Sequence, residues 1–166
     1  MTIRQLFPDD ASEFQALRLA GLLECPEAFT SSHAEEVDTP LDVIAGRLAP
    51  KDDSAVFGYF TGGRLIGLIG VQRESRRKLS HKAFIWGMYV AREHRRKGIG
   101  RSLMARALDH ATSSLEVKMV NLGVNTQNSA AITLYRAMGF ETYGTERGFI
   151  TIDGIAHDQH LMSHHF

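Results

Sequence analysis

Basic residues and glycines that could hold an anion gather in the segment HRRKGIG, residues 94 to 100. Its cations and glycines, with the arginine that follows, are Arg95, Arg96, Lys97, Gly98, Gly100 and Arg101. The segment lies between a strand-like run, FIWGMYV, and an amphipathic run, RSLMARALDHA, so it predicts a turn from strand to helix. Such a turn directs several backbone N–H groups and the positive end of the helix dipole at one point. Because glycines let a ligand approach the backbone, the segment is suited to bind a pyrophosphate.

Two other phosphate-binding motifs do not fit these residues. A dinucleotide fingerprint needs a third glycine three residues after Gly100, where this sequence has Leu103. A mononucleotide P-loop closes with Gly-Lys-Ser or Gly-Lys-Thr, whereas Lys97 precedes Gly98 here. Taken alone, the segment is also compatible with a solvated basic turn, in which the glycines only reverse the chain.

Extended and helical patterns alternate on both sides of this turn. The runs expected to form strands are residues 2–7, 54–60, 64–74, 83–90, 117–124, 148–152 and 155–162. The runs expected to form helices begin near Pro8 and cover residues 8–22, 41–49, 101–115 and 129–139. Residues 24–39 are polar and predicted to be irregular. The pattern predicts an α/β (α+β) fold, with a mixed, mostly antiparallel sheet and helices on both faces, in a single domain spanning 1–166.

Caps and turns mark the ends of these elements. Thr39 before Pro40 predicts a helix N-cap, and Gly139 predicts a helix stop. Hairpin turns are expected at Gly62-Gly63 and at Asp153-Gly154. Gly87, within an aromatic and β-branched run, suggests a bulge.

Charge and cysteine content narrow the function classes. The 19 basic and 19 acidic residues balance, so no overall field favours nucleic acid or a membrane surface as the partner. The single Cys25 cannot form an intramolecular disulfide, and the chain shows no signal or membrane-spanning run, so a cytoplasmic location is expected. His157 and His160 fall on opposite faces of a strand, and no metal site is predicted.

A family resemblance combines the basic turn with a second segment. RRKGIG after a strand and before a helix resembles the Arg/Gln-x-x-Gly-x-Gly/Ala motif of the GNAT superfamily of N-acetyltransferases, with Arg95, Gly98 and Gly100 on the defining positions. NTQNSAAITLYRAMGF, residues 125 to 140, is similar to the superfamily's following strand end and helix. The resemblance covers nearly the whole chain. It implies a GNAT-like sheet of six to seven strands, with a splay between the fourth and fifth strands, and acetyl-CoA as the cofactor and acetyl donor.

The resemblance also implies a role for each matching residue. Met88, Tyr89 and Val90 correspond to the strand segment whose main chain pairs with the pantetheine arm. The pyrophosphate is expected on Arg95, Arg96, Lys97, Gly98, Ile99, Gly100 and Arg101. The splayed strand ends near Asn125, Asn128 is placed to hydrogen-bond the cofactor arm, and Tyr135 lies where the family keeps a hydroxyl near the sulfur.

The chemistry of acetyl transfer accounts for these residue types. An amine that attacks a thioester forms a tetrahedral oxyanion, which an N–H group of the strand near Tyr89 to Ala91 could stabilise. The thiolate that leaves belongs to a thiol with a pKa of about 8.5, and a tyrosine with a pKa near 10 can protonate it. Tyr135 is therefore the predicted general acid.

The residues do not assign the base that deprotonates the amine. Some relatives carry a carboxylate on the strand corresponding to residues 83–90, but AFIWGMYV has none. Glu35 and Glu36 are catalytic candidates, because they lie in the polar loop where this fold receives substrate. Glu74, His81 and water ordered by the backbone remain alternatives.

The function predicted from the sequence is an acetyl-CoA-dependent N-acetyltransferase. It moves an acetyl group to a primary amine of a small molecule or peptide by direct transfer in a ternary complex. A non-catalytic acyl-CoA-binding sensor on the same fold and an acyltransferase with a longer acyl donor are the alternatives. The identity of the acceptor and a homodimeric state are left open.

Overall fold

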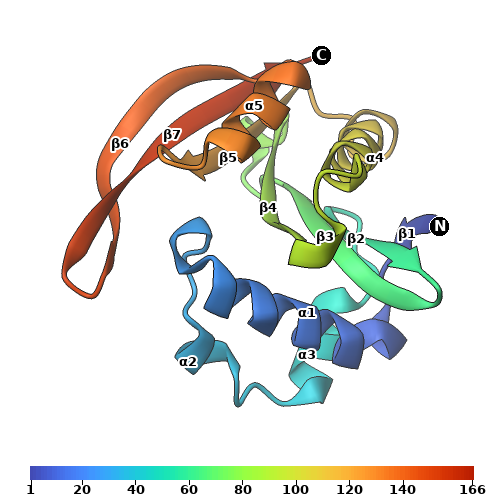
Figure 1. Ribbon diagram of the computed structural model, residues 1–166. Helices are drawn as coiled ribbons and strands as arrows, with labels where there is room; N and C mark the ends of the chain where they lie inside the picture. Colours follow the sequence, from blue (N-terminus) through green and yellow to red (C-terminus); the bar gives the residue numbers. More distant parts are fainter.

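Seven strands form one sheet in a computed structural model that describes all 166 residues (Figure 1). The strands are β1 (Thr2–Gln5), β2 (Ser54–Thr61), β3 (Arg64–Arg73), β4 (Lys82–Val90), β5 (Met119–Asn125), β6 (Glu141–Ile152) and β7 (Ile155–His165). Their order is β1-β2-β3-β4-β5-β7-β6. Only β4 and β5 run parallel, and every other neighbouring pair is antiparallel. The predicted mixed, mostly antiparallel sheet is confirmed.

Helices cover both faces of the sheet (Figure 1). They are α1 (Ala11–Glu24), α2 (His33–Glu36) and α3 (Leu41–Leu48) on one face, and α4 (Ile99–Ser113) and α5 (Ser129–Ala137) on the other. Since side chains alternate along a strand, Val56 and Leu68 pack with α1 and α3, while Phe57 and Ile69 pack with α4. Each face therefore has its own hydrophobic cluster, and the larger one lies under α4 and α5.

The predicted turns are present, and their backbone angles explain the residues used. Asp153 and Gly154 both have positive φ, 49° and 79°, as a two-residue hairpin turn requires. Gly139 ends α5 with a φ of 85°. Gly62 and Gly63 join β2 to β3 with φ values of 57° and 81°.

Several elements differ from the sequence-based expectation. The segment expected to be irregular contains α2, which begins with a capping box between Ser32 and Glu35. The N-cap of α3 is Pro40 rather than Thr39, and its carbonyl accepts from Ile44 N–H. β6 begins at Glu141 rather than near Gly148, because its first half is mostly exposed and carries polar residues that hide the strand pattern.

β4 and β5 separate after a short paired stretch, as the fold prediction required. They pair only where residues 82–84 meet residues 119–121. Further along, β4 bulges, since Ile69 of β3 lies opposite both Gly87 and Met88, and Gly87 has a φ of 63°. The end of β4 is thereby left without a partner on the β5 side.

Candidate active site

A cavity of about 960 Å³ lies where β4 and β5 separate. Its walls come from these two strands, the first turn of α4, α5, the loop after α1, and the β6–β7 hairpin. Met88 and Val90 of β4 face the cluster under α4 and α5, whereas Trp86 and Tyr89 face the cluster under α1. The cavity therefore connects the two faces of the sheet through the splay.

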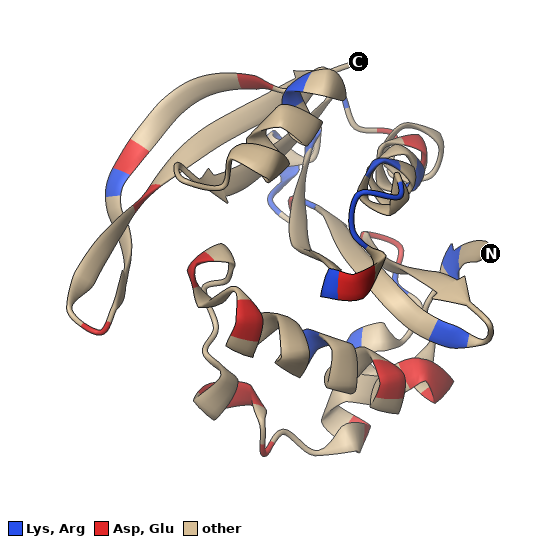
Figure 2. Ribbon diagram, viewed as in Figure 1, with Lys and Arg blue, Asp and Glu red and all other residues tan.

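The turn into α4 presents a row of backbone donors. The N–H groups of residues 96 to 101 have no hydrogen-bond acceptor within the chain, and the first helical bond runs from Ser102 N–H to Gly98 O. Gly98 is the N-cap with a φ of 77°, and nothing lies within 4 Å of a Cβ built on it. The turn is blue with basic residues in Figure 2, and Arg96 and Arg101 line the cavity. Unpaired donors, cationic side chains and open space together suit a polyanion such as a pyrophosphate.

Arg101 also donates to Ala137 O at 3.4 Å, and the other two cations of this turn make closer contacts within the chain, although Arg95 lines the cavity as well. The Arg95 guanidinium lies 3.0 Å from Glu24, and its Nε donates to Val90 O at 2.9 Å. Lys97 Nζ donates to Glu93 O at 3.2 Å, and Lys97 does not line the cavity. Within this turn, Arg96 and Arg101 are therefore the cations that line the cavity without an ion pair to a carboxylate.

Tyr89 directs its side chain away from the splay. Its hydroxyl donates to Glu24 at 2.5 Å, and its ring lies against α1, where a Cβ on Gly21 would be 3.0 Å from it. Burial, together with the Glu24 carboxylate, raises the pKa of Tyr89. The hydrogen bond from Tyr89, followed by the charge of Arg95, lowers the pKa of Glu24. Tyr89 thus anchors β4 to α1.

The main chain of Val90 faces the unpaired side of β4. Ala91 N–H donates to Ile66 O of β3. Because backbone groups alternate along a strand, the N–H and C=O of Val90 point to the opposite side, where the splay opens. Arg95 already uses the Val90 carbonyl, so the Val90 N–H is the donor left for a ligand strand.

Tyr135 on α5 lies in the wall of the cavity, in contact with Met88. Its side chain is buried, its hydroxyl donates to Met88 Sδ at 3.6 Å, and both residues line the cavity. Burial raises the pKa of Tyr135 to about 12, so the hydroxyl keeps its proton near neutral pH. A Cβ on Gly100 would lie 3.1 Å from Met88 Cε and 3.2 Å from Leu134 Cδ2, so a larger residue would require these two side chains to shift.

Two asparagines hold the chain between β5 and α5. Asn128 Oδ1 caps α5 by accepting from Ala131 N–H at 3.1 Å, so its Nδ2 remains as a donor at the cavity wall. Asn125 Oδ1 accepts from Gln127 N–H at 2.8 Å, and its Nδ2 lies 3.4 Å from His157 Nδ1.

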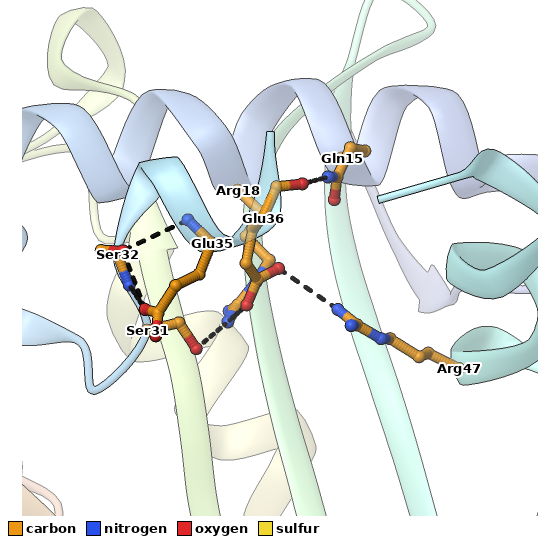
Figure 3. A network of polar contacts seen from close by, with 7 residues as sticks. All are labelled: Gln15, Arg18, Ser31, Ser32, Glu35, Glu36 and Arg47. Carbon is orange, nitrogen blue, oxygen red and sulfur yellow. Dashed lines mark hydrogen bonds and ion pairs between the residues drawn. The ribbon is translucent and has the colours of Figure 1, made fainter. Parts of the chain in front are cut away.

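The two predicted base candidates do not line the cavity. Figure 3 shows the polar contacts that hold their side chains. Glu35 is exposed and closes the capping box, and the backbone hydrogen bond from Ser32 lowers its pKa. Glu36 is buried between Arg18 and Arg47, and the hydrogen bonds from Arg18 lower its pKa to about 2. A carboxylate held this way is a weak base near neutral pH. The alternatives Glu74 and His81 do not line the cavity either.

Glu27 is the carboxylate that does line the cavity, and sequence reasoning did not identify it. It lies in the 3₁₀ turn Pro26–Ala28, which contacts β5 and β6 and so crosses the opening of the splay. Arg18 and Phe29 also line the cavity. The one usable signal was Phe29, an apolar residue inside a polar segment that needs a surface to pack against.

The chain brings together no group of three or more His, Cys, Asp and Glu side chains that could hold a metal ion. Its helices also include none that is long and apolar enough to cross a membrane.

Comparison with known proteins places these features in a family. The sequence model described as Acetyltransferase (GNAT) family matches residues 20–140, which contain the basic turn, the splay and α5. The chain belongs to this family. An N-alpha-acetyltransferase, RimI of Mycobacterium tuberculosis, is 35% identical over 98 residues, which are 58% of this chain. The chain spans less than two thirds of the length of the curated relatives it matches, and 58% in the case of RimI.

Solved structures with this fold extend over nearly the whole chain. A GNAT-family acetyltransferase from Streptococcus pneumoniae superposes with a TM-score of 0.89 at 23% identity, over 99% of both chains. The protein yncA of Salmonella typhimurium, solved with its cofactor acetyl-CoA, superposes with a TM-score of 0.82 at 21% identity, over 99% of this chain and 93% of its own. At these identities the likeness establishes the GNAT fold.

Proposed function

We propose that this protein is an acetyl-CoA-dependent N-acetyltransferase that acts as a single domain. The observation that carries the proposal is one continuous cavity, lined by the free donors of the α4 turn, Tyr135 of α5 and Glu27 of the loop after α1. A cofactor site, a proton donor and a carboxylate thus share one space. Membership of the GNAT family supports acetyl-CoA as the donor.

The residues present fit coenzyme A part by part. The N–H groups of residues 96 to 101, with Arg96 and Arg101, bind the pyrophosphate. Val90 N–H and Asn128 Nδ2 are donors for the amide-containing arm, which enters the splay as an added strand would. Bound acetyl-CoA supplies a thioester, the activated form of the acetyl group.

Tyr135 acts as the general acid in this proposal. Its raised pKa keeps the hydroxyl protonated, and Met88, its present partner, is a weak acceptor that a departing thiolate can replace. Glu27 is the group that we assign to hold the acceptor ammonium and to take up its proton. It replaces Glu35 and Glu36, which are bound in local contacts outside the cavity.

Direct transfer within a ternary complex fits the cavity better than a covalent acyl-enzyme. Cys25, the single cysteine, does not line the cavity, and burial raises the pKa of its thiol, which makes it a poor nucleophile. A lone free thiol also agrees with a cytoplasmic location, where thiols stay reduced.

An acyl-CoA-binding sensor without catalysis is the second candidate. It is favoured by the lack of any carboxylate on β4, the strand that lines the cavity. The two functions are separated by incubating the protein with acetyl-CoA and a panel of amines and peptides. Thiol release together with an acetylated product detected by mass spectrometry supports the enzyme. Stabilisation by acetyl-CoA without thiol release from any amine supports the sensor.

A further inference from the structure

Arg18 is a cation that the transfer chemistry above does not use, yet it lines the cavity. It projects from α1 toward the bulge of β4, where its Nη1 lies 3.6 Å from the position of a Cβ on Gly87. Its guanidinium carbon lies 5.9 Å from the centre of the Phe29 ring. The side chain is only 11% exposed, so the surrounding chain fixes its position.

Counting its donors shows which part of Arg18 is free. Its Nε donates to Glu36 Oε2 at 3.0 Å, and Nη2 donates to Glu36 Oε1 at 2.7 Å and to Ser31 Oγ at 3.4 Å (Figure 3). A guanidinium has five N–H groups, so these bonds use three and leave both hydrogens of Nη1. No group of the chain accepts from Nη1, although the residue lies at the cavity wall.

Two cations share one carboxylate in the cluster that holds Arg18. Glu36 pairs with both Arg18 and Arg47, whereas the neighbouring Glu35 is bonded to Ser32. Gln15 Nε2 donates to Glu36 O at 2.8 Å and fixes α2 against α1 (Figure 3). Arg47 is 46% exposed and does not line the cavity, so Arg18 is the cation of this cluster that a ligand in the cavity can reach.

The cavity that Arg18 borders is lined by many apolar side chains and by one carboxylate. Large side chains in this lining include Phe29, Phe84, Trp86, Tyr143, Phe149 and Leu161. Glu27 stands two residues before Phe29 on the same loop. The cavity thus offers an anion-binding group, a cation-binding group and an apolar wall.

We propose that Arg18 Nη1 binds the carboxylate of the acceptor, and that the acceptor is a free α-amino acid with an apolar side chain. Glu27 faces its ammonium and the aromatic residues contact its side chain. The proposal rests on the proposed function. A peptide N-terminus lacks a carboxylate next to its amine and would leave Nη1 with only a neutral carbonyl, so peptides are expected to bind more weakly.

The test measures binding, so it does not depend on turnover. The protein saturated with coenzyme A is titrated by calorimetry with L-phenylalanine, L-leucine and L-methionine, and with the amide of each. We expect at least one free amino acid to bind about tenfold or more tightly than its amide, the usual gain from a charge-assisted hydrogen bond. Equal binding of acid and amide, or no binding of any free amino acid, would overturn the proposal.

Two variants separate recognition from structural support. Arg18→Met removes the free donor, and Arg47→Met is the matched control, since it removes the other partner of Glu36 from outside the cavity. The preference for the acid should disappear in Arg18→Met and persist in Arg47→Met. Equal loss in both variants would mean that the cluster only supports the fold. If Arg18→Met does not fold, the acid and amide comparison on the unmodified protein still decides.

The outcome for transfer is read separately, as thiol release from acetyl-CoA. Binding of free amino acids without release contradicts the proposed transferase and leaves carboxylate recognition standing. Release at equal rates with amino acids and their amides contradicts carboxylate recognition alone.

Discussion

The guanidinium of Arg95 lies 3.0 Å from the carboxylate of Glu24, so the first residue of the Arg-x-x-Gly-x-Gly segment is bound to α1. The same carboxylate accepts from the hydroxyl of Tyr89 on β4. Arg95 also donates to Val90 O and lies over the Tyr89 ring, 5.5 Å from its centre. Arg95 therefore joins the end of β4 to α1, and it lines the cavity together with Arg96 and Arg101.

Arg95→Met is expected to lower folding stability, whereas Arg96→Met is expected to weaken acetyl-CoA binding. Arg95→Met should lower the free energy of unfolding by about 1 kcal/mol, because a partly exposed ion pair and a hydrogen bond are lost. Arg96→Met should change stability by less than about 0.5 kcal/mol but weaken acetyl-CoA binding and reduce its dependence on salt. Calorimetric titration measures the acetyl-CoA affinity, and denaturant unfolding measures the stability.

Lys97→Met is the control, since Lys97 does not line the cavity. A loss of affinity in Lys97→Met equal to that in Arg96→Met would mean that only the net charge of the turn matters.

Gly98→Val should abolish stabilisation by acetyl-CoA. The matched control is Gly62→Val, because both glycines have positive φ, 77° and 57°, and neither would place a Cβ within 4 Å of another group. Each variant should lose about 1–2 kcal/mol of folding stability from backbone strain. At a ligand concentration 100 times the Kd, acetyl-CoA should stabilise the unmodified protein and Gly62→Val by about 2.7 kcal/mol. A full cofactor shift in Gly98→Val would contradict the assignment of the α4 turn.

Most of the fold could be predicted from local patterns in the sequence. Alternating apolar residues, hairpin glycines and the aromatic run with Gly87 are local signals, and they predicted the strands, the turns and the bulge that opens the splay. β6 was placed too short because an exposed hairpin strand needs no regular apolar alternation. Its length is set by pairing with β7, which local patterns do not report.

Side-chain partners from distant segments explain what the sequence did not predict about the site. Glu35, Glu36 and Glu27 lie on one short polar segment and look equivalent in sequence. Glu36 is bound by arginines of α1 and α3, and Glu35 by its own cap, which leaves Glu27 at the cavity. These differences depend on helix packing rather than on residue type or spacing.

The free energy of unfolding should fall in acid, because the stabilising contribution of the Glu36 carboxylate is lost there. Its folded-state pKa of about 2 lies below the ordinary 4.5, so its contribution is fully present above about pH 4.5 and is lost as the pH falls toward 2. Glu36→Gln should cost about 3 kcal/mol at pH 7, because two arginines lose their shared carboxylate, and the difference from the unmodified protein should shrink below pH 4. Urea unfolding at several pH values measures this. Glu35→Gln, on the exposed side of α2, should show a smaller cost; a pH-independent difference for Glu36→Gln would contradict the ion cluster.

Tyr135→Phe should separate chemistry from binding. Only the weak hydrogen bond to Met88 Sδ is lost, so folding and acetyl-CoA affinity should stay nearly unchanged. The maximal rate should fall at least about tenfold, since general acid assistance is commonly worth 10² to 10⁴. Because the pKa of Tyr135 is about 12, the ratio of the two rates should stay constant from pH 6 to 9. Tyr59→Phe, which loses a similar bond to Met1 Sδ away from the cavity, is the control.

The choice of acyl donor sharpens this last prediction. When the leaving thiol of the donor is more acidic, its thiolate departs with less help from an acid. The rate loss in Tyr135→Phe should therefore be smaller with such a donor, whereas a packing defect would slow transfer from both donors equally. Steady-state rates with acetyl-CoA and such a donor, on the same acceptor, give the comparison. Rates equal to those of the unmodified protein with both donors would show that the hydroxyl is not the acid. In that case Tyr135 serves only as a buried aromatic that packs against Phe140, with ring centres 6.0 Å apart.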